Sequence, residues 1–147
     1  MTLWDWTLRT YERPGVPEAC LALQDRYLIN TSYLLWAAWA APDEAALRAG
    51  LSMSTTWNQI LWPLRNARRD LKAPQPGIDD EARLALREDV KAAELRAERL
   101  LMESLERLAG PAAGPVDLSA VLTRAAEAWR KQPAPREEVA DLVAALA

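Results

Sequence analysis

The chain of 147 residues contains no histidine, no phenylalanine, one cysteine and only five glycines. Histidine is the usual acid–base group at neutral pH and the commonest metal ligand, so its absence excludes histidine-dependent triads and zinc sites of the Cys/His type. The glycines, at positions 15, 50, 77, 110 and 114, fit neither a dinucleotide-binding fingerprint nor a phosphate-binding loop. We therefore expect no metal site and no cofactor.

The chain also lacks the signals of secreted and membrane proteins. Cys20 cannot form an internal disulfide, and we interpret it as a small buried residue. The N-terminus has no signal-peptide pattern, and the longest uncharged apolar run, Tyr33 to Ala41, has nine residues where a membrane span takes about 20. We expect a cytoplasmic protein without a membrane span.

Seven tryptophans and many helix-forming residues are present instead. No stretch alternates apolar and polar residues over the length of a strand, and prolines and glycines fall between segments of helical period. The sequence predicts an all-α protein, a single-domain bundle of about seven or eight helices with one long helix and one kinked helix. The expected helices cover about residues 3–13, 17–29, 33–41, 43–49, 55–72 and 79–108, with two more after the connector at 110–115. We expect residues 1–110 to form the core domain and residues 111–147 to form a helical pair that docks on this core or binds a partner.

Three details of these helices can be checked directly. The segment 33–41 is apolar on every side, so it should be the central helix. Gly50 should close a short helix, and Pro63 should kink or break the next helix near Trp62. The longest helix should pack through a seam of residues spaced by three and four, namely Leu86, Val90, Ala93, Ala97, Leu100, Ser104 and Leu108.

Two groups of residues are candidates for binding within the core domain. Arg65, Arg68, Arg69 and Lys72 share one helix face, which predicts either a site for an anionic partner or a face that is solvated or paired with the acidic long helix. The second group predicts either an apolar ligand pocket or plain core packing. Its members are Trp36, Trp39, Trp57 and Trp62, with Asp25 and Asn30 as nearby polar groups.

The C-terminal helix offers a third candidate surface. Its apolar row must cover the core, a second copy or a groove of a partner. The row consists of Val139, Leu142, Val143 and Leu146.

Several segments of the first half are similar to a known family. They are Leu3-Trp4-Asp5-Trp6, Tyr11-x-Arg13-Pro14-Gly15-Val16, Ala19-Cys20-Leu21-x-Leu23-Gln24-Asp25-Arg26, and Asn30 followed by Leu34-Leu35-Trp36-x-x-Trp39. In this order they resemble the small proteobacterial proteins known as domain of unknown function 2390, over roughly Leu3 to Leu108. The resemblance implies a shared fold and a bacterial origin, and it assigns no activity and no catalytic residue.

Three functions remain for such a chain. The first is a non-catalytic interaction or regulatory protein that binds another protein or forms a homodimer; its net charge of −3 gives no overall attraction to nucleic acid, and we expect no sequence-specific nucleic-acid binding. The second is a carrier or sensor of a small apolar ligand among the tryptophans. The third is an enzyme that uses carboxylates such as Asp5 and Asp25 without histidine.

Overall fold

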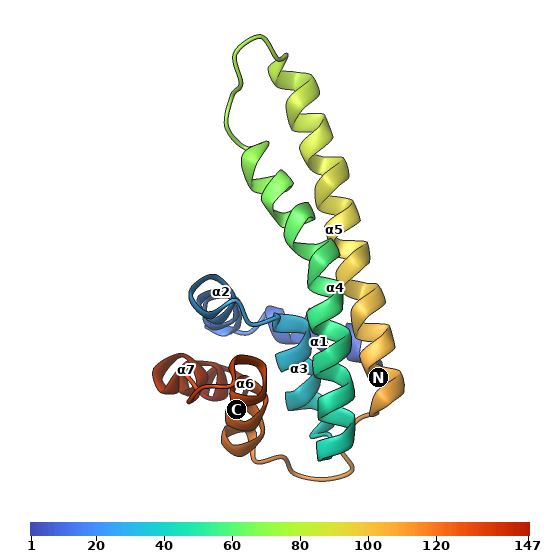
Figure 1. Ribbon diagram of the computed structural model, residues 1–147, viewed down its shortest axis with the longest axis vertical. Coiled ribbons are helices and arrows are strands. Elements are labelled where there is room, and N and C mark those ends of the chain that lie inside the picture. The colour runs from blue at the N-terminus through green and yellow to red at the C-terminus, as the bar shows by residue number, and fades with distance from the viewer.

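Seven α-helices and no strands make up the computed structural model, which describes all residues from 1 to 147. The helices are α1 (Leu3–Tyr11), α2 (Val16–Tyr27), α3 (Thr31–Ala40), α4 (Glu44–Asp70), α5 (Asp80–Leu108), α6 (Leu118–Arg130) and α7 (Arg136–Leu146). The longest two, α4 and α5, form an antiparallel hairpin that rises from a base made by the other five (Figure 1). The prediction of an all-α bundle is confirmed. None of the seven helices is both long enough and apolar enough to cross a membrane.

Short polar side chains begin most of the helices. Each of them accepts a hydrogen bond from a backbone N–H of the first turn, which would otherwise lack a partner. These capping residues are Thr2, Asn30, Asp43, Asp79 and Asp117. α2 instead follows Gly15, whose φ of 88° lies in the left-handed region that glycine adopts without strain.

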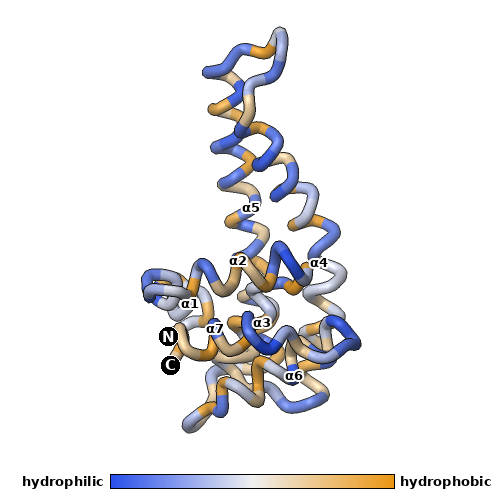
Figure 2. The backbone as a smooth tube through the Cα atoms, turned by 90° about the vertical axis from the view of Figure 1, so that its left-hand side faces the viewer, coloured by the Kyte–Doolittle hydropathy of each residue, from blue (hydrophilic) through white to orange (hydrophobic).

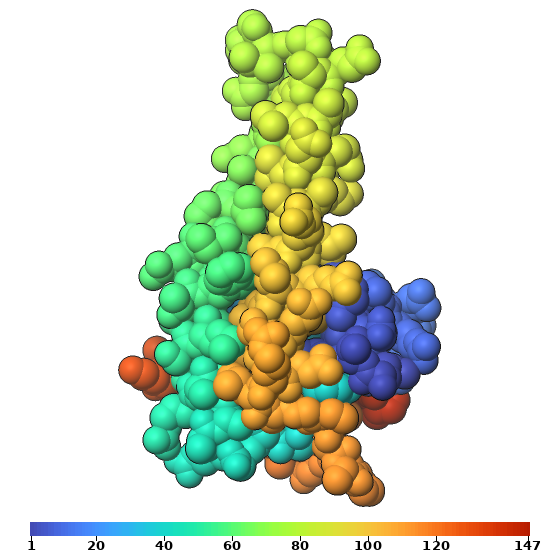
Figure 3. Space-filling view, turned by 90° about the vertical axis from the view of Figure 1, so that its right-hand side faces the viewer, coloured from blue at the N-terminus to red at the C-terminus, as the bar shows by residue number.

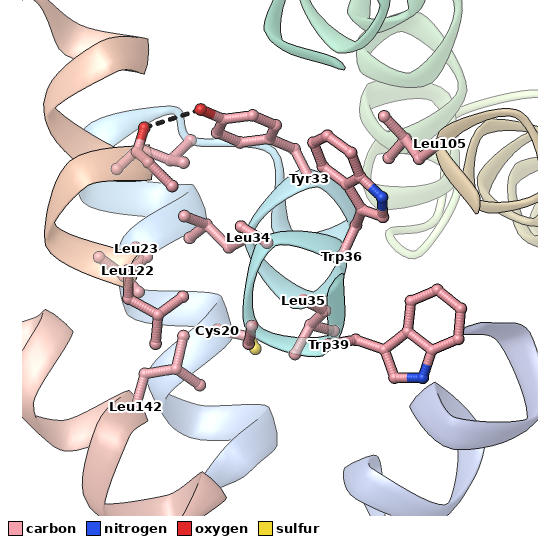
Figure 4. Close-up of a cluster of buried hydrophobic side chains, with 14 of the residues drawn as sticks. Cys20, Leu23, Tyr33, Leu34, Leu35, Trp36, Trp39, Leu105, Leu122 and Leu142 are labelled. Atoms are coloured by element: carbon pink, nitrogen blue, oxygen red, sulfur yellow. Dashed lines mark hydrogen bonds between the residues drawn. The ribbon is translucent and has the colours of Figure 1, made fainter. Parts of the chain in front are cut away.

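The central helix is α3, as its composition predicts. Every residue from Ser32 to Ala40 is buried. Its two largest fully buried side chains satisfy their polar atoms internally: the Tyr33 hydroxyl donates to the Ala125 carbonyl at 3.0 Å, and Trp36 Nε1 donates to the Ala109 carbonyl at 3.1 Å. Figure 4 shows these side chains with the leucines of the neighbouring helices around them. The core of the base is therefore built around α3.

α4 is one continuous helix where the sequence predicts two. Gly50 lies inside it and does not end it. The reason is a close approach: a Cβ atom on Gly50 would lie 2.4 Å from Cζ3 of Trp36, so only glycine lets α4 cross over this ring. Pro63 also lies within α4 without ending it.

The last two helices, α6 and α7, pack against α3 and α2 within the base. The apolar residues of α6 and α7 belong to the same hydrophobic cluster as those of α2 and α3. Polar contacts add to this packing: Glu138 of α7 accepts a hydrogen bond from the Tyr27 hydroxyl at 3.0 Å, and Arg13 donates to the Leu146 carbonyl at 2.9 Å. The outer half of the hairpin, in contrast, stands clear of the base, and hydrophilic and hydrophobic residues alternate along it (Figure 2).

Candidate functional site

Four charged side chains join α4 to α5 through ion pairs. We call Arg65, Arg68, Glu94 and Glu98 the waist cluster. Arg68 Nε lies 2.5 Å from Glu94 Oε2, and Arg65 Nε lies 3.5 Å from Glu94 Oε1. Arg65 Nη2 lies 3.7 Å from Glu98 Oε1. Arg65 and Glu94 are both buried, so each charge offsets part of the cost of burying the other.

Burial and neighbouring charges shift the titration of this cluster. Burial raises the pKa of the Glu98 carboxyl to about 7, and the negative charge of Glu94 raises it further, against the opposing effect of the arginines. Burial lowers the pKa of Arg65, whereas the hydrogen bond to Glu94 raises the pKa of Arg68. Since arginine stays protonated in proteins, Glu98 is the member of the waist cluster whose charge changes near neutral pH.

Contacts from the base reach α4 beside the waist cluster. Arg69 Nη2 lies 2.8 Å from Asp25 Oδ1 at the end of α2, and Asn30 Nδ2 donates to Asn58 Oδ1 at 2.8 Å. These contacts tie α4 to the segment that connects α2 with α3. The position of the hairpin relative to the base is thus held by polar groups as well as by the core.

A small pocket of about 240 Å³ opens beside the waist cluster. It is lined by Arg68, Lys91, Glu94, Leu95 and Glu98. Ligand pockets for small molecules usually enclose about 300–1,000 Å³, and three of the four charged groups here already form ion pairs within the protein. The ion pairs at this pocket join α4 to α5.

Beyond the waist cluster, the inner face of the hairpin is charged. Arg83 of α5 is buried, pairs with Asp80 and donates from Nε to the Leu71 carbonyl at 3.1 Å. Arg87 donates from Nε to the Arg68 carbonyl at 3.1 Å. The carbonyls at the C-terminal end of a helix have no hydrogen-bond donor within the helix. At the end of α4, arginine side chains of α5 donate to two such carbonyls.

Large apolar side chains of the hairpin are exposed instead. Eleven large hydrophobic side chains of the protein are exposed, and six of them belong to the hairpin: Ile60, Ile78, Leu84, Leu86, Leu95 and Leu100. The predicted seam of α5 is therefore wrong, because Leu86 and Leu100 are exposed and only Ala97 among its members is fully buried. Its place is taken in the outer half by Arg83, Arg87 and Glu94.

The four tryptophans of the predicted pocket lie at different depths. Trp36 is fully buried and Trp39 is buried, so both belong to the core of the base. Trp62 lies under the guanidinium of Arg65, 5.2 Å from its ring centroid. Among the five principal pockets only one is lined by any of the four, a shallow groove of about 200 Å³ at Trp57.

The two polar residues of that predicted pocket have structural partners. Asn30 Oδ1 accepts a hydrogen bond from the Tyr33 backbone N–H at 3.0 Å and so caps α3. Asp25 forms the ion pair with Arg69 described above. The structure therefore does not bring Asp25 and Asn30 together with the four tryptophans around one of the principal pockets.

Three members of the predicted basic stripe are paired with carboxylates. Arg65 and Arg68 belong to the waist cluster, and Arg69 pairs with Asp25. Lys72 lies past the end of α4, is exposed and forms no ion pair. Arg65 and Arg68 thus pair with the acidic long helix, and the binding of an anionic partner by the stripe stays a prediction.

The predicted apolar row on the C-terminal helix points into the core of the base. Val139, Leu142 and Leu146 are buried, and Val143 packs against the same hydrophobic cluster. The row therefore covers the core in this structure, where α7 lies against α2 and α6.

The largest of the principal pockets is an acidic groove of about 550 Å³ between α2 and α7. Glu18, Glu137 and Asp141 line it and are exposed. Glu137 lies in the first turn of α7, where the helix dipole favours acidic residues. No three acidic side chains are arranged to hold a metal ion, so we assign no chemistry to this groove.

Sequence reasoning missed the most informative residues, which are the inward-facing Arg83, Arg87, Glu94 and Glu98. A usable signal existed. Arg65 and Arg68 are spaced by three on one helix, and Glu94 and Glu98 are spaced by four on the next, so each pair occupies one helix face. Only the register of the hairpin, which the sequence does not reveal, brings the two pairs together.

Comparison with known proteins identifies a family. The model of the family described as "Protein of unknown function (DUF2390)" matches residues 2–105, which include α1 to α4 and nearly all of α5. No curated protein and no solved structure shows a significant match.

Proposed function

Because the chain belongs to the DUF2390 family, whose description states no activity, we propose its function from the geometry: a non-catalytic interaction protein that binds another protein through the α4–α5 hairpin. One observation carries the proposal. Beyond the waist cluster, the hairpin buries Arg83 on its inner face and exposes Leu84 and Leu86. Exposed apolar residues that gather on one element are typical of a protein-binding surface.

The arrangement of the rest of the molecule supports this assignment. The base buries the C-terminal row in its core, and the hairpin is the element that extends away from it (Figure 1). The waist cluster joins the two helices of this element, and the Asp25–Arg69 ion pair links it to the base. A binding surface that is held in place before association loses less conformational entropy on binding.

The exposed leucines of the hairpin lie along two flanks of α5. Leu84 and Leu95 lie on one flank, and Leu86 and Leu100 lie on the other, nearly half a helical turn away. Two such flanks fit a partner that offers helices of its own, because apolar stripes at helical spacing pack against one another as in a bundle.

Photo-crosslinking in the cells that make the protein tests the proposal. A photoreactive phenylalanine analogue replaces Leu86 or Leu95, which are 51% and 52% exposed. Matched controls carry it at Leu21 and Leu28 of the base, which are 51% and 56% exposed. We expect discrete protein adducts from the hairpin positions and none from the base positions. Equal adducts from both sets, or none from the hairpin, would overturn the proposal.

A further inference from the structure

One exposed strip of α5 has a symmetric order of residues. Leu84, Glu88, Lys91 and Leu95 are spaced by four, three and four, which places them within about 60° of one another around the helix. All four are exposed, and Glu88 makes only a 3.9 Å contact with its neighbour Arg87. Read in either direction, the strip begins with a leucine, passes two charged residues and ends with a leucine.

This order makes the strip complementary to itself in an antiparallel arrangement. If the two-fold axis passes between Asp89 and Val90, Leu84 of one copy lies opposite Leu95 of the other, and Glu88 lies opposite Lys91. Each layer then pairs an a position of one copy with a d position of the other, as in antiparallel coiled coils. A parallel arrangement would place Glu88 opposite Glu88 and Lys91 opposite Lys91, so the charges specify the antiparallel one.

The same face of α5 is already a packing face nearer the base. There α1 covers it: the Arg99 guanidinium lies 5.6 Å from the ring centroid of Trp4, and the Leu3 backbone N–H donates to Glu106 Oε2 at 3.0 Å. α1 does not extend along the outer part of α5, which has no neighbour on that side (Figure 3). The strip from Leu84 to Leu95 therefore lies on the same face of α5 that α1 covers nearer the base, but α1 does not cover the strip.

We propose that a second copy of the chain covers this strip, so that two hairpins pair antiparallel through α5. This inference rests on the proposed function of the hairpin and names the partner of one flank. The strip spans about three helical turns, which is short for a permanent interface, so the dimer forms and separates readily. The other flank, with Leu86 and Leu100, stays open in the dimer.

Charge reversal tests the pairing with two single variants. Glu88→Lys places two lysines opposite two lysines, and Lys91→Glu places two glutamates opposite two glutamates. Each dimer then loses two attractive pairs and gains two repulsive ones, which should raise its Kd by roughly 30-fold. Sedimentation equilibrium at protein concentrations up to about 1 mM, a range that includes weak dimers, measures this change.

An equimolar mixture of the two variants provides the sharpest test. A Glu88→Lys chain presents two lysines and a Lys91→Glu chain presents two glutamates, so the mixed pair is again complementary. We expect the mixture to dimerise about as well as the wild type, although each variant alone does not. Asp89→Lys and Arg96→Glu make the same charge changes on exposed positions outside the strip and should leave the Kd within about twofold.

The outcomes separate this inference from the function it rests on. A wild-type chain that stays monomeric, or a mixture that dimerises no better than the single variants, would overturn pairing through the strip. If the hairpin positions nevertheless give adducts with a different protein, docking by the hairpin stands and only its partner was misassigned. If the chain is monomeric and the hairpin gives no adducts, both proposals fail.

Discussion

Arg83 and Leu84 are neighbours in α5, yet the structure buries the arginine to 5% exposure and leaves the leucine 47% exposed. The burial of the arginine in place of the leucine has a local cause, because Arg83 donates to the Leu71 carbonyl at the end of α4 and pairs with Asp80. An apolar residue at position 83 would leave that carbonyl without this partner. The outer half of the hairpin is thus held together by polar groups, and its leucines remain available on the outside.

Gly50→Ala should destabilise the protein. Alanine normally favours a helix over glycine by about 1 kcal/mol, but here its Cβ would meet the Trp36 ring at 2.4 Å in a buried site. We expect a net loss of about 1–3 kcal/mol in the free energy of unfolding, measured in urea. Gly110→Ala is the control, because an added Cβ there meets no atom within 4 Å. A gain in stability from Gly50→Ala would contradict the close crossing of α4 over α3.

Glu98→Gln should change how stability depends on pH. The folded state raises the pKa of Glu98 from 4.5 to about 7, so between these values it binds more protons than the unfolded state. The contribution of Glu98 to stability is therefore present at low pH and falls as the pH rises toward 7. Glutamine does not titrate, so the stability of the variant does not fall with pH for this reason.

Urea unfolding of Glu98→Gln and wild type at pH 5 and pH 8 measures the effect. The variant should gain roughly 1–3 kcal/mol relative to the wild type on going from the lower to the higher pH. A difference between the two proteins that is the same at both pH values would show that Glu98 titrates in the folded state as it does in the unfolded one.

Cys20 should be inert in the folded protein. Its side chain is buried, and this burial raises the pKa of the thiol to about 11 against a smaller opposing effect of the Tyr11 hydroxyl. The reactive thiolate is therefore scarce and inaccessible at pH 8. A chromogenic disulfide reagent should react with the native protein far more slowly than with the protein in concentrated urea. Equal rates would place Cys20 at the surface.

The sequence predicts the base better than the hairpin. α3 is apolar on all sides, and Thr2 and Asn30 are typical capping residues, so local signals suffice to place α1 and α3. The continuity of α4 through Gly50 could not be predicted, because the requirement for glycine comes from Trp36 in another helix. A glycine that ends a helix and a glycine that lets a ring approach look alike in the sequence.

The hairpin misleads sequence reasoning for a related reason. The spacing of Leu86, Ala93 and Leu100 is typical of a buried face, yet the carbonyls and arginines of α4 select a charged face of α5. Hydrophobic periodicity records which residues share a face and carries no information about the polar groups opposite. The same limit left the role of Arg65 and Arg68 open until the register of the hairpin placed them beside Glu94.

The most direct test of the account compares two adjacent alanine substitutions in α5. Arg83→Ala removes a buried side chain with a charge-assisted hydrogen bond, so it should lower the free energy of unfolding by about 1–3 kcal/mol. Leu84→Ala removes an exposed side chain, so it should change that free energy by less than about 0.5 kcal/mol. Both are measured by urea unfolding at a protein concentration low enough to keep the chain monomeric. The reverse order, a large loss from Leu84→Ala and none from Arg83→Ala, would contradict a hairpin that holds its charges inside and its leucines outside.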